Sequence, residues 1–151
     1  MIDPNTLREK VFEMKTNVSE IKSVKFVIDD DELASEFTAH TGKENMLLGV
    51  VLPSYDGFGK EDESGIRSFL QFFVMEKVDY KTFKTQDDYI DVFQRTLLVS
   101  RKMIKFFFGV DGENCLSMDL DYSSLKVYPV SKKSQCNGYV IEIDEEKYQD
   151  F

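Results

Sequence analysis

Two acidic segments are the first candidates for chemistry, because carboxylate oxygens are the ligands that hard cations such as Ca²⁺ prefer. Segment 29–36 opens with three consecutive aspartates, and segment 54–65 reads SYDGFGKEDESG. The carboxylates of 54–65 lack the alternating spacing of an EF-hand loop, and no second ligand cluster accompanies 29–36. A helix N-terminus capped by Asp30 or Asp31 also accounts for the aspartates. We predict no metal ligands, although the sequence alone leaves metal binding by either segment open.

The candidate nucleophiles and bases are equally few. Cys115 and Cys136 have neither the spacing of a zinc site nor a CxxC redox motif, and whether they pair depends on whether their strands are neighbours. His40 is the only histidine, so any Ser-His-Asp or Cys-His arrangement would require it. We expect His40 to be a surface residue without a catalytic role. The prediction is therefore a protein that is not an enzyme and has no catalytic residues.

A partial match to a phosphate-binding loop occurs at Thr41-Gly42-Lys43. A P-loop also needs a glycine five residues before the second glycine, and a Ser or Thr after the lysine to hold magnesium. Phe37 stands at the first of these positions and Glu44 at the other. The motif is therefore rejected, and no cofactor is predicted.

The overall charge limits the partners that the protein can have. The chain carries a formal net charge of −9, and such a surface repels nucleic-acid backbones. No apolar run approaches the roughly 20 residues that span a bilayer, and the N-terminal residues lack the pattern of a secretory signal. We expect a single cytoplasmic domain over residues 1–151 that binds neither nucleic acid nor membranes.

The longest helical pattern, residues 85–108, must organise any site. Thr85 with Asp88 three residues later indicates the beginning of this helix, and Gly109 indicates its end. Apolar residues recur along it at three- and four-residue steps. The face expected to be buried comprises Tyr89, Phe93, Thr96, Leu97, Ser100, Ile104 and Phe107. Because further apolar residues widen this face, the helix needs cover from more than one direction.

The other patterns predict an α+β fold, a mostly antiparallel sheet of about five strands with two main helices packed on one face. A helix should begin at Asp3-Pro4 and end near Lys22. Both faces of the strand 67–78 are apolar, so it should be central and covered on both sides. The two helices would cover one face, and segment 30–39 or a second copy would cover the other. The expected strands are 23–28, 46–52, 67–78, 125–130 and 139–144, with a further short one suggested at 113–121.

Three expectations concern the ends of the strands. Pro53 should end the strand before it, which makes 54–65 a long solvated loop within a hairpin. Asn137-Gly138 should close the loop before the last strand. The polar tail 145–151 should fray.

Exposed aromatic side chains are the candidate partner contacts. Tyr55 and Phe58 lie among glycines in the expected long loop, where aromatic side chains would be available to another protein. Phe106 belongs to the wide apolar surface of the 85–108 helix. We predict that these residues contact partner proteins, with further copies of the chain among them.

The strand pattern NMLLGVVLPS, the 85–108 helix and the closing KKSQCNGYVIEI strand resemble small prophage-encoded proteins of Bacteroides-type bacteria. Their length and element order are similar to those of tail-terminator or tail-completion proteins of long-tailed phages. The resemblance covers about residues 40 to 144 and implies a non-enzymatic subunit that assembles into a ring at a tail end or head–tail joint. It transfers no functional residue, since that class has no strict motif. The N-terminal helix and segment 29–36 have no place in the pattern.

A secretion-chaperone-like module is the alternative. Such a protein is of similar size, is acidic, dimerises through a helix and holds an unfolded segment by strand addition. A small enzyme with an unrecognised carboxylate site is a third class, which would require two or more carboxylates in a deep pocket.

Overall fold

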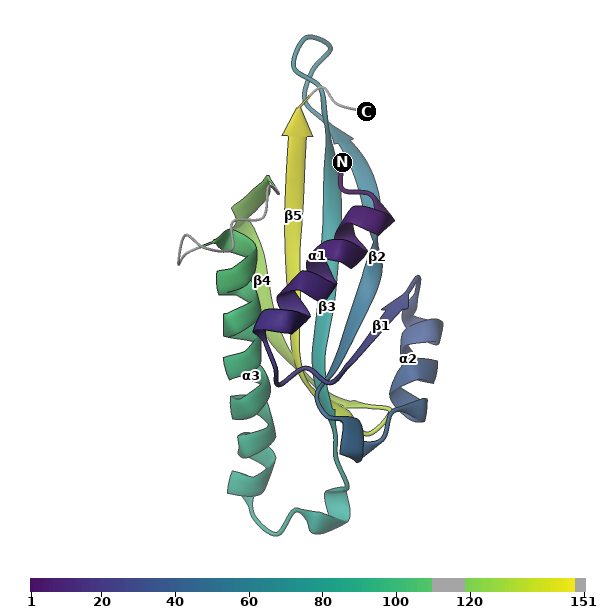
Figure 1. Ribbon diagram of the computed structural model, residues 1–151, viewed down its shortest axis with the longest axis vertical. Helices are drawn as coiled ribbons and strands as arrows, with labels where there is room; N and C mark the ends of the chain where they lie inside the picture. Colours follow the sequence, from purple (N-terminus) through teal and green to yellow (C-terminus); the bar gives the residue numbers. More distant parts are fainter. Residues whose placement is uncertain (110–118, 149–151) are drawn as a thin grey trace.

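A five-stranded sheet in the order β1-β2-β3-β5-β4 forms the centre of the computed structural model, which describes residues 1–109 and 119–148 (Figure 1). β1 pairs with β2 in parallel, and the other three pairs are antiparallel. The predicted α+β fold with a mostly antiparallel sheet is confirmed. The elements are α1 (Pro4–Asn17), β1 (Ser23–Val27), α2 (Asp30–Ala39), β2 (Leu47–Phe58), β3 (Gly65–Lys77), α3 (Gln86–Phe108), β4 (Leu120–Lys133) and β5 (Cys136–Tyr148).

Side chains of α1 and α3 join one hydrophobic cluster with side chains of the sheet. Leu7 and Val11 of α1 and Met103 of α3 are fully buried in it. Phe107 of α3 stacks on Phe72 of β3, with the ring centroids 5.1 Å apart. α1 ends earlier than predicted, at Asn17. Residues Leu7, Val11, Met14, Val18 and Ile21 are nevertheless all buried.

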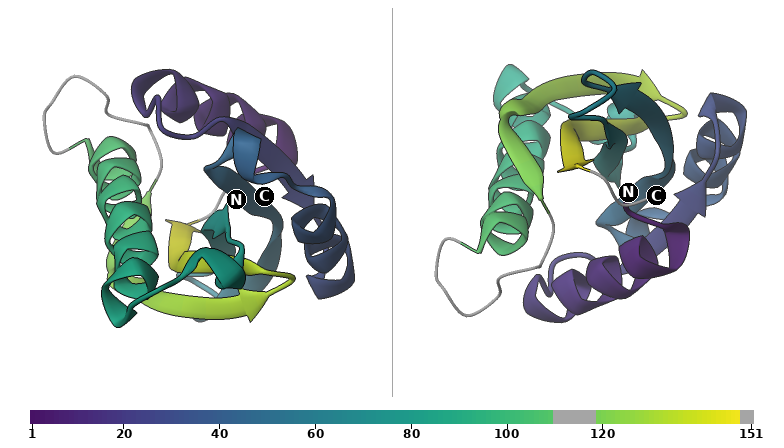
Figure 2. Two further views of the ribbon diagram at one scale, coloured as in Figure 1. Left: turned by 90° about the horizontal axis from the view of Figure 1, so that it is seen from below. Right: turned by 90° about the horizontal axis from the view of Figure 1, so that it is seen from above.

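A second, smaller cluster lies on the other side of β3, where α2 packs. Leu33 and Phe37 of α2 are fully buried against Phe73 and Met75 of β3. Figure 2 shows α2 and α3 on opposite flanks of the molecule. The predicted two-sided cover of the central strand is thus confirmed, and α2 of the same chain supplies it.

The ends of α3 are those that the sequence predicts. The Thr85 side chain accepts a hydrogen bond from the Asp88 backbone, and the Asp88 side chain accepts one from the Thr85 backbone. Gly109 ends the helix in the left-handed conformation, with φ of 62°. The capping box and the glycine satisfy backbone groups that a helix leaves unpaired at its two ends.

The buried face of α3 lies further round the helix than predicted. Tyr89, Phe93, Leu97 and Ile104 are only partly buried. The residues that are buried are Val92, Thr96, Val99, Ser100, Met103, Phe106 and Phe107. Edge-to-face aromatic contacts link Tyr89 to Phe93 and Phe93 to Tyr139 of β5, and they hold the first two rings at the border of the core.

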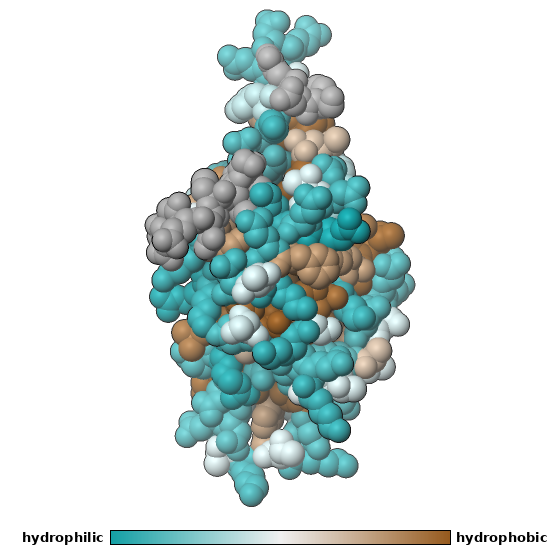
Figure 3. Space-filling view, in the orientation of Figure 1, coloured by the Kyte–Doolittle hydropathy of each residue, from teal (hydrophilic) through white to brown (hydrophobic). Residues whose placement is uncertain are grey.

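The hairpin of β2 and β3 is longer than expected, and the predicted loop 54–65 is wrong. β2 continues through Pro53 to Phe58, and the residues between the paired strands are 59–64. A register shift between Val51 and Ser54 gives Pro53, which has no N–H to donate, a place in the strand. The hairpin projects past the helices, and its end is hydrophilic (Figures 1 and 3).

The turn predicted at Asn137-Gly138 lies at Ser134 and Gln135 instead, both of which have positive φ. Gly138 stands in β5 because the strands approach closely there, and a Cβ atom would lie 1.9 Å from the Val74 carbonyl oxygen. β5 also extends to Tyr148, so the described part of the expected frayed tail is paired with β3. Most of the strand suggested at 113–121 lies outside the described residues.

No helix in the described ranges is long and apolar enough to cross a membrane.

The shifted face of α3 predicts a contrast between two truncations. Met103→Ala should lower the free energy of unfolding by about 2–5 kcal/mol, because it leaves a cavity in the core. Leu98→Ala, on the outer side of the same helix, should lower it by less than about 1 kcal/mol. Urea denaturation of both variants measures this, and equal losses would show that the face is misassigned.

Candidate functional site

His40 is buried rather than on the surface, which corrects the sequence prediction. Its Nε2 lies 2.7 Å from Oδ1 of Asn45. Asn45 in turn donates to the Lys77 carbonyl oxygen and accepts from the Lys77 backbone N–H. The Lys77 ammonium group donates to the carbonyl oxygens of Phe37 and Thr38 at the end of α2. These bonds tie the end of α2 to the sheet and give His40 a structural role.

Cys136 is buried in the cluster under α2, and burial raises the pKa of its thiol to about 11. A thiol with such a pKa is protonated at neutral pH and is a poor nucleophile. Cys115 lies outside the described residues.

The acidic segments are explained by helix and hairpin structure. Asp29, not Asp30 or Asp31, caps α2, and its side chain accepts from the Glu32 backbone N–H at 2.9 Å. In the part of the chain that the structure describes, no group of three or more His, Cys, Asp or Glu residues could hold a metal ion.

The predicted partner-contact residues do not lie together. The Tyr55 hydroxyl donates to the Ile2 carbonyl oxygen at 2.8 Å, which fixes the segment before α1 against the sheet. Phe58 packs edge-on against Tyr148, with the centroids 4.9 Å apart. Phe106 is only 4% exposed and belongs to the core, so its side chain offers no surface to a partner, contrary to the prediction.

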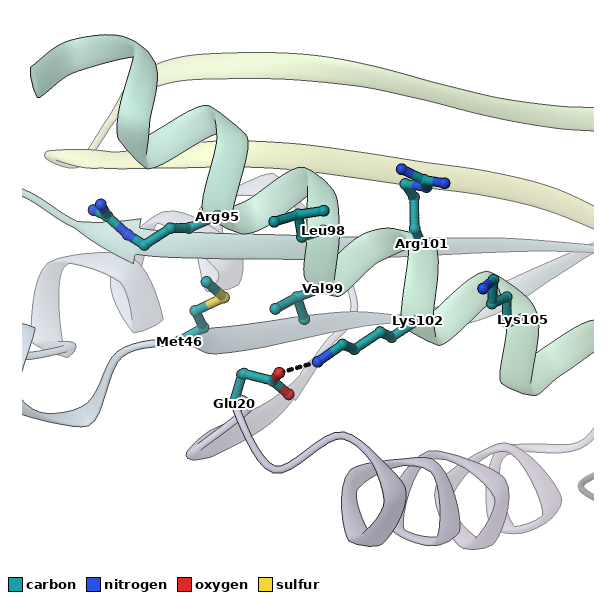
Figure 4. Close-up of a pocket in the computed structure, with 8 residues that line it drawn as sticks. All are labelled: Glu20, Met46, Arg95, Leu98, Val99, Arg101, Lys102 and Lys105. Carbon is teal, nitrogen blue, oxygen red and sulfur yellow. Dashed lines mark hydrogen bonds and ion pairs between the residues drawn. The ribbon is translucent and has the colours of Figure 1, made fainter. Parts of the chain in front are cut away.

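A groove of about 450 Å³ between α3 and the connection from α1 to β1 is the first candidate site. Its apolar lining is Met46, which precedes β2, with Leu98 and Val99 of α3 (Figure 4). Glu20, in the connection between α1 and β1, forms its opposite edge. The basic side chains that line it are Arg95, Arg101, Lys102 and Lys105.

The local structure of α3 explains this composition. Arg95, Leu98, Lys102 and Lys105 follow one another at steps of three and four, so they form a stripe along one side of the helix. Positive side chains in the last turns also complement the helix dipole. The groove is consequently basic in a protein whose net charge is −9.

Among the described residues, ion pairs hold two of these four cations. Lys102 pairs with Glu20, and Nε of Arg95 donates to Glu76 at 3.0 Å. The hydrogen bond from Lys102 is the main cause that lowers the pKa of Glu20. Within 1–109 and 119–148, no carboxylate forms an ion pair with Arg101. The groove therefore offers an apolar floor beside positive charge, which suits an amphipathic, acidic ligand or segment.

A second hollow lies near the beginning of α3. It has a volume of about 430 Å³ and is bordered by Tyr80, Phe83 and Tyr89 with Lys84 and Lys132. The rings contact one another edge-on, with Tyr80 and Phe83 centroids 5.8 Å apart. These aromatic side chains therefore already contact one another within the chain.

The sequence contained part of the signal for the groove. The basic residues at 101–105 were visible but are equally well explained by the helix dipole. Glu20 and Met46 come from distant parts of the chain, and no pattern along the sequence links them to α3.

Comparison with known proteins finds no matching family model and no matching curated protein.

The ion pair at the edge of the groove predicts a change in the titration of Glu20. Lys102→Ala should raise the pKa of Glu20 toward 4.5, its ordinary value, because the main lowering cause is lost. Carboxyl-detected NMR titration measures this, and Arg101→Ala should leave the pKa unchanged. Folding lowers the pKa of Glu20, so the ion pair stabilises the folded state at pH values above about 4.5. This stabilisation is lost as the pH falls through the pKa that Glu20 has in the folded state. An unaltered Glu20 pKa in Lys102→Ala would contradict the pairing.

Proposed function

We propose that the chain is a non-enzymatic assembly subunit that acts through self-association, as a prophage tail-terminator or head–tail joining protein does. The observation that carries the proposal is the groove on α3, whose Leu98 is 45% exposed beside positive side chains. An exposed apolar side chain ringed by charge is typical of a protein–protein contact, with an apolar centre and a polar rim.

The chemistry of the groove favours binding over catalysis. Its lining has one carboxylate, Glu20, and that group is already paired with Lys102. An acid–base pair needs two titrating groups held in different environments. A docking surface needs shape, apolar area and charge, all of which the lining provides.

A second function, the secretion-chaperone-like one, is favoured by a different surface. β1 is an edge strand of only five residues. Phe12 of α1 is 46% exposed and packs against the partly buried Phe26 of β1. Figure 3 shows apolar surface across the middle of this face of the molecule. An extended segment could add to this edge and place its side chains on the aromatic pair.

The mass in solution distinguishes these functions. The native chain should form a discrete species of several 17.5 kDa subunits, and Leu98→Asp should convert it to the monomer, because it places a charge in the apolar floor of the groove. Phe12→Asp is the matched control, since the two side chains are almost equally exposed but lie on different surfaces. Light scattering after size-exclusion chromatography measures the masses.

Two other outcomes would count against the assembly proposal, and a third would count only against the groove as its interface. A native chain that stays monomeric at high concentration would overturn it. A dimer that Phe12→Asp dissociates and Leu98→Asp does not would favour the chaperone-like function. An assembly that both variants leave intact would place the interface elsewhere.

A further inference from the structure

We propose that the groove on α3 receives the knob of a second copy of the chain, the knob being the exposed side chains of Ile28, Asp30 and Asp31. This inference rests on the proposed self-association and names the interface through which it takes place.

The knob combines an apolar side chain with two exposed carboxylates. Ile28, in the link from β1 to α2, is 66% exposed. Asp31 is exposed, and the side chain of Asp30 is 88% exposed, with a 3.4 Å contact to Lys133. The knob thus combines apolar area with negative charge, whereas the groove combines apolar area with positive charge.

The backbone around the knob is held in place within its own chain. The Ile28 backbone N–H donates to Glu32 Oε2 at 2.8 Å, and the Asp29 side chain caps α2. Asp29 and Glu32 are thereby used internally, and the exposed Asp30 carboxylate pairs with Lys133. Ile28 and Asp31 stay exposed. A preformed knob loses little conformational entropy on binding, which favours association.

Charge selects this pairing among the possible contacts between copies. Two chains of net charge −9 repel each other in most orientations. The groove is a concentration of positive side chains on that acidic surface, so an approach that brings the carboxylates of the knob to Arg101 and Lys105 is attractive. Such complementarity fixes the orientation and register of association. Ile28 would then cover Leu98, and both would lose exposed apolar surface.

The position of the two surfaces requires a head-to-tail contact. α2 and α3 lie on opposite flanks of the sheet, so the knob of a chain does not reach its own groove (Figures 1 and 2). A contact between two different surfaces repeats from copy to copy, and it closes into a ring or continues as a filament according to its rotation. A ring subunit needs a contact of this kind.

Two variants that each block one surface test the pairing. The double variant Asp30→Arg with Asp31→Arg reverses the charge of the knob and leaves the groove intact. Leu98→Arg blocks the groove and leaves the knob intact. Each variant alone should be a monomer of 17.5 kDa. An equimolar mixture should form a 1:1 dimer and nothing larger, because the intact knob of one fits the intact groove of the other while the two altered surfaces repel.

Ile28→Arg serves as a second knob variant that leaves the first turn of α2 unchanged, and circular dichroism checks that all variants fold. The mixture with Leu98→Arg should again be a dimer. Variants that assemble like the native chain, or monomers that do not pair when mixed, would overturn the inference and leave self-association standing. A native chain that is itself monomeric would overturn the proposed function instead.

Discussion

The burial of β3 on both faces is the constraint from which the arrangement of the molecule follows. Phe72 on one face and Phe73 on the other are both buried, so neither can be left to water. α1 and α3 cover the first face, and α2 covers the second. A chain with helices on only one side would expose the apolar surface around Phe73. The two-sided cover therefore sends α2 and α3 to opposite flanks, where their outer sides face solvent in different directions.

The charges of these outer sides arise from helix stability. Acidic residues gather at the beginning of α2, and basic residues gather toward the end of α3, as the helix dipole favours. As a result, the flank formed by α2 carries negative charge and the flank formed by α3 carries positive charge. The proposed knob and groove use it, since each adds an exposed apolar side chain, Ile28 or Leu98, to the charged region. The same residues thus stabilise the helices and could join neighbouring copies.

The fold class, the beginning of α1 and both ends of α3 could be predicted because they depend on local patterns, whereas the end of α1 and the cap of α2 lie a few residues from their predicted positions. Asp3 and Thr85 act as helix caps, and Gly109 adopts the left-handed conformation, all as their sequence positions indicate. The errors concern residues whose surroundings are distant in the sequence. Pro53 stays in β2 because a bulge accommodates it, and Gly138 is required by the backbone of β3 rather than by a turn.

The candidate site was harder to predict than the fold. His40 was expected on the surface, yet it is buried through hydrogen bonds that link Asn45 and Lys77, which come from separate parts of the chain. The groove likewise needs Glu20 and Met46 beside α3, and only the packed structure brings them there. A pattern along one helix shows which side chains share a face. It does not show what lies opposite them.

Carbodiimide cross-linking of a mixture of ¹⁴N- and ¹⁵N-labelled chains tests the central claim most directly, because it joins carboxylates to lysines that are in contact. The Asp30–Lys133 and Glu20–Lys102 pairs should cross-link within one copy and serve as internal controls. The account predicts additional mixed-isotope cross-links that join Asp30 or Asp31 of one copy to Lys105 of another. Efficient control cross-links without any mixed-isotope product between these residues would contradict it.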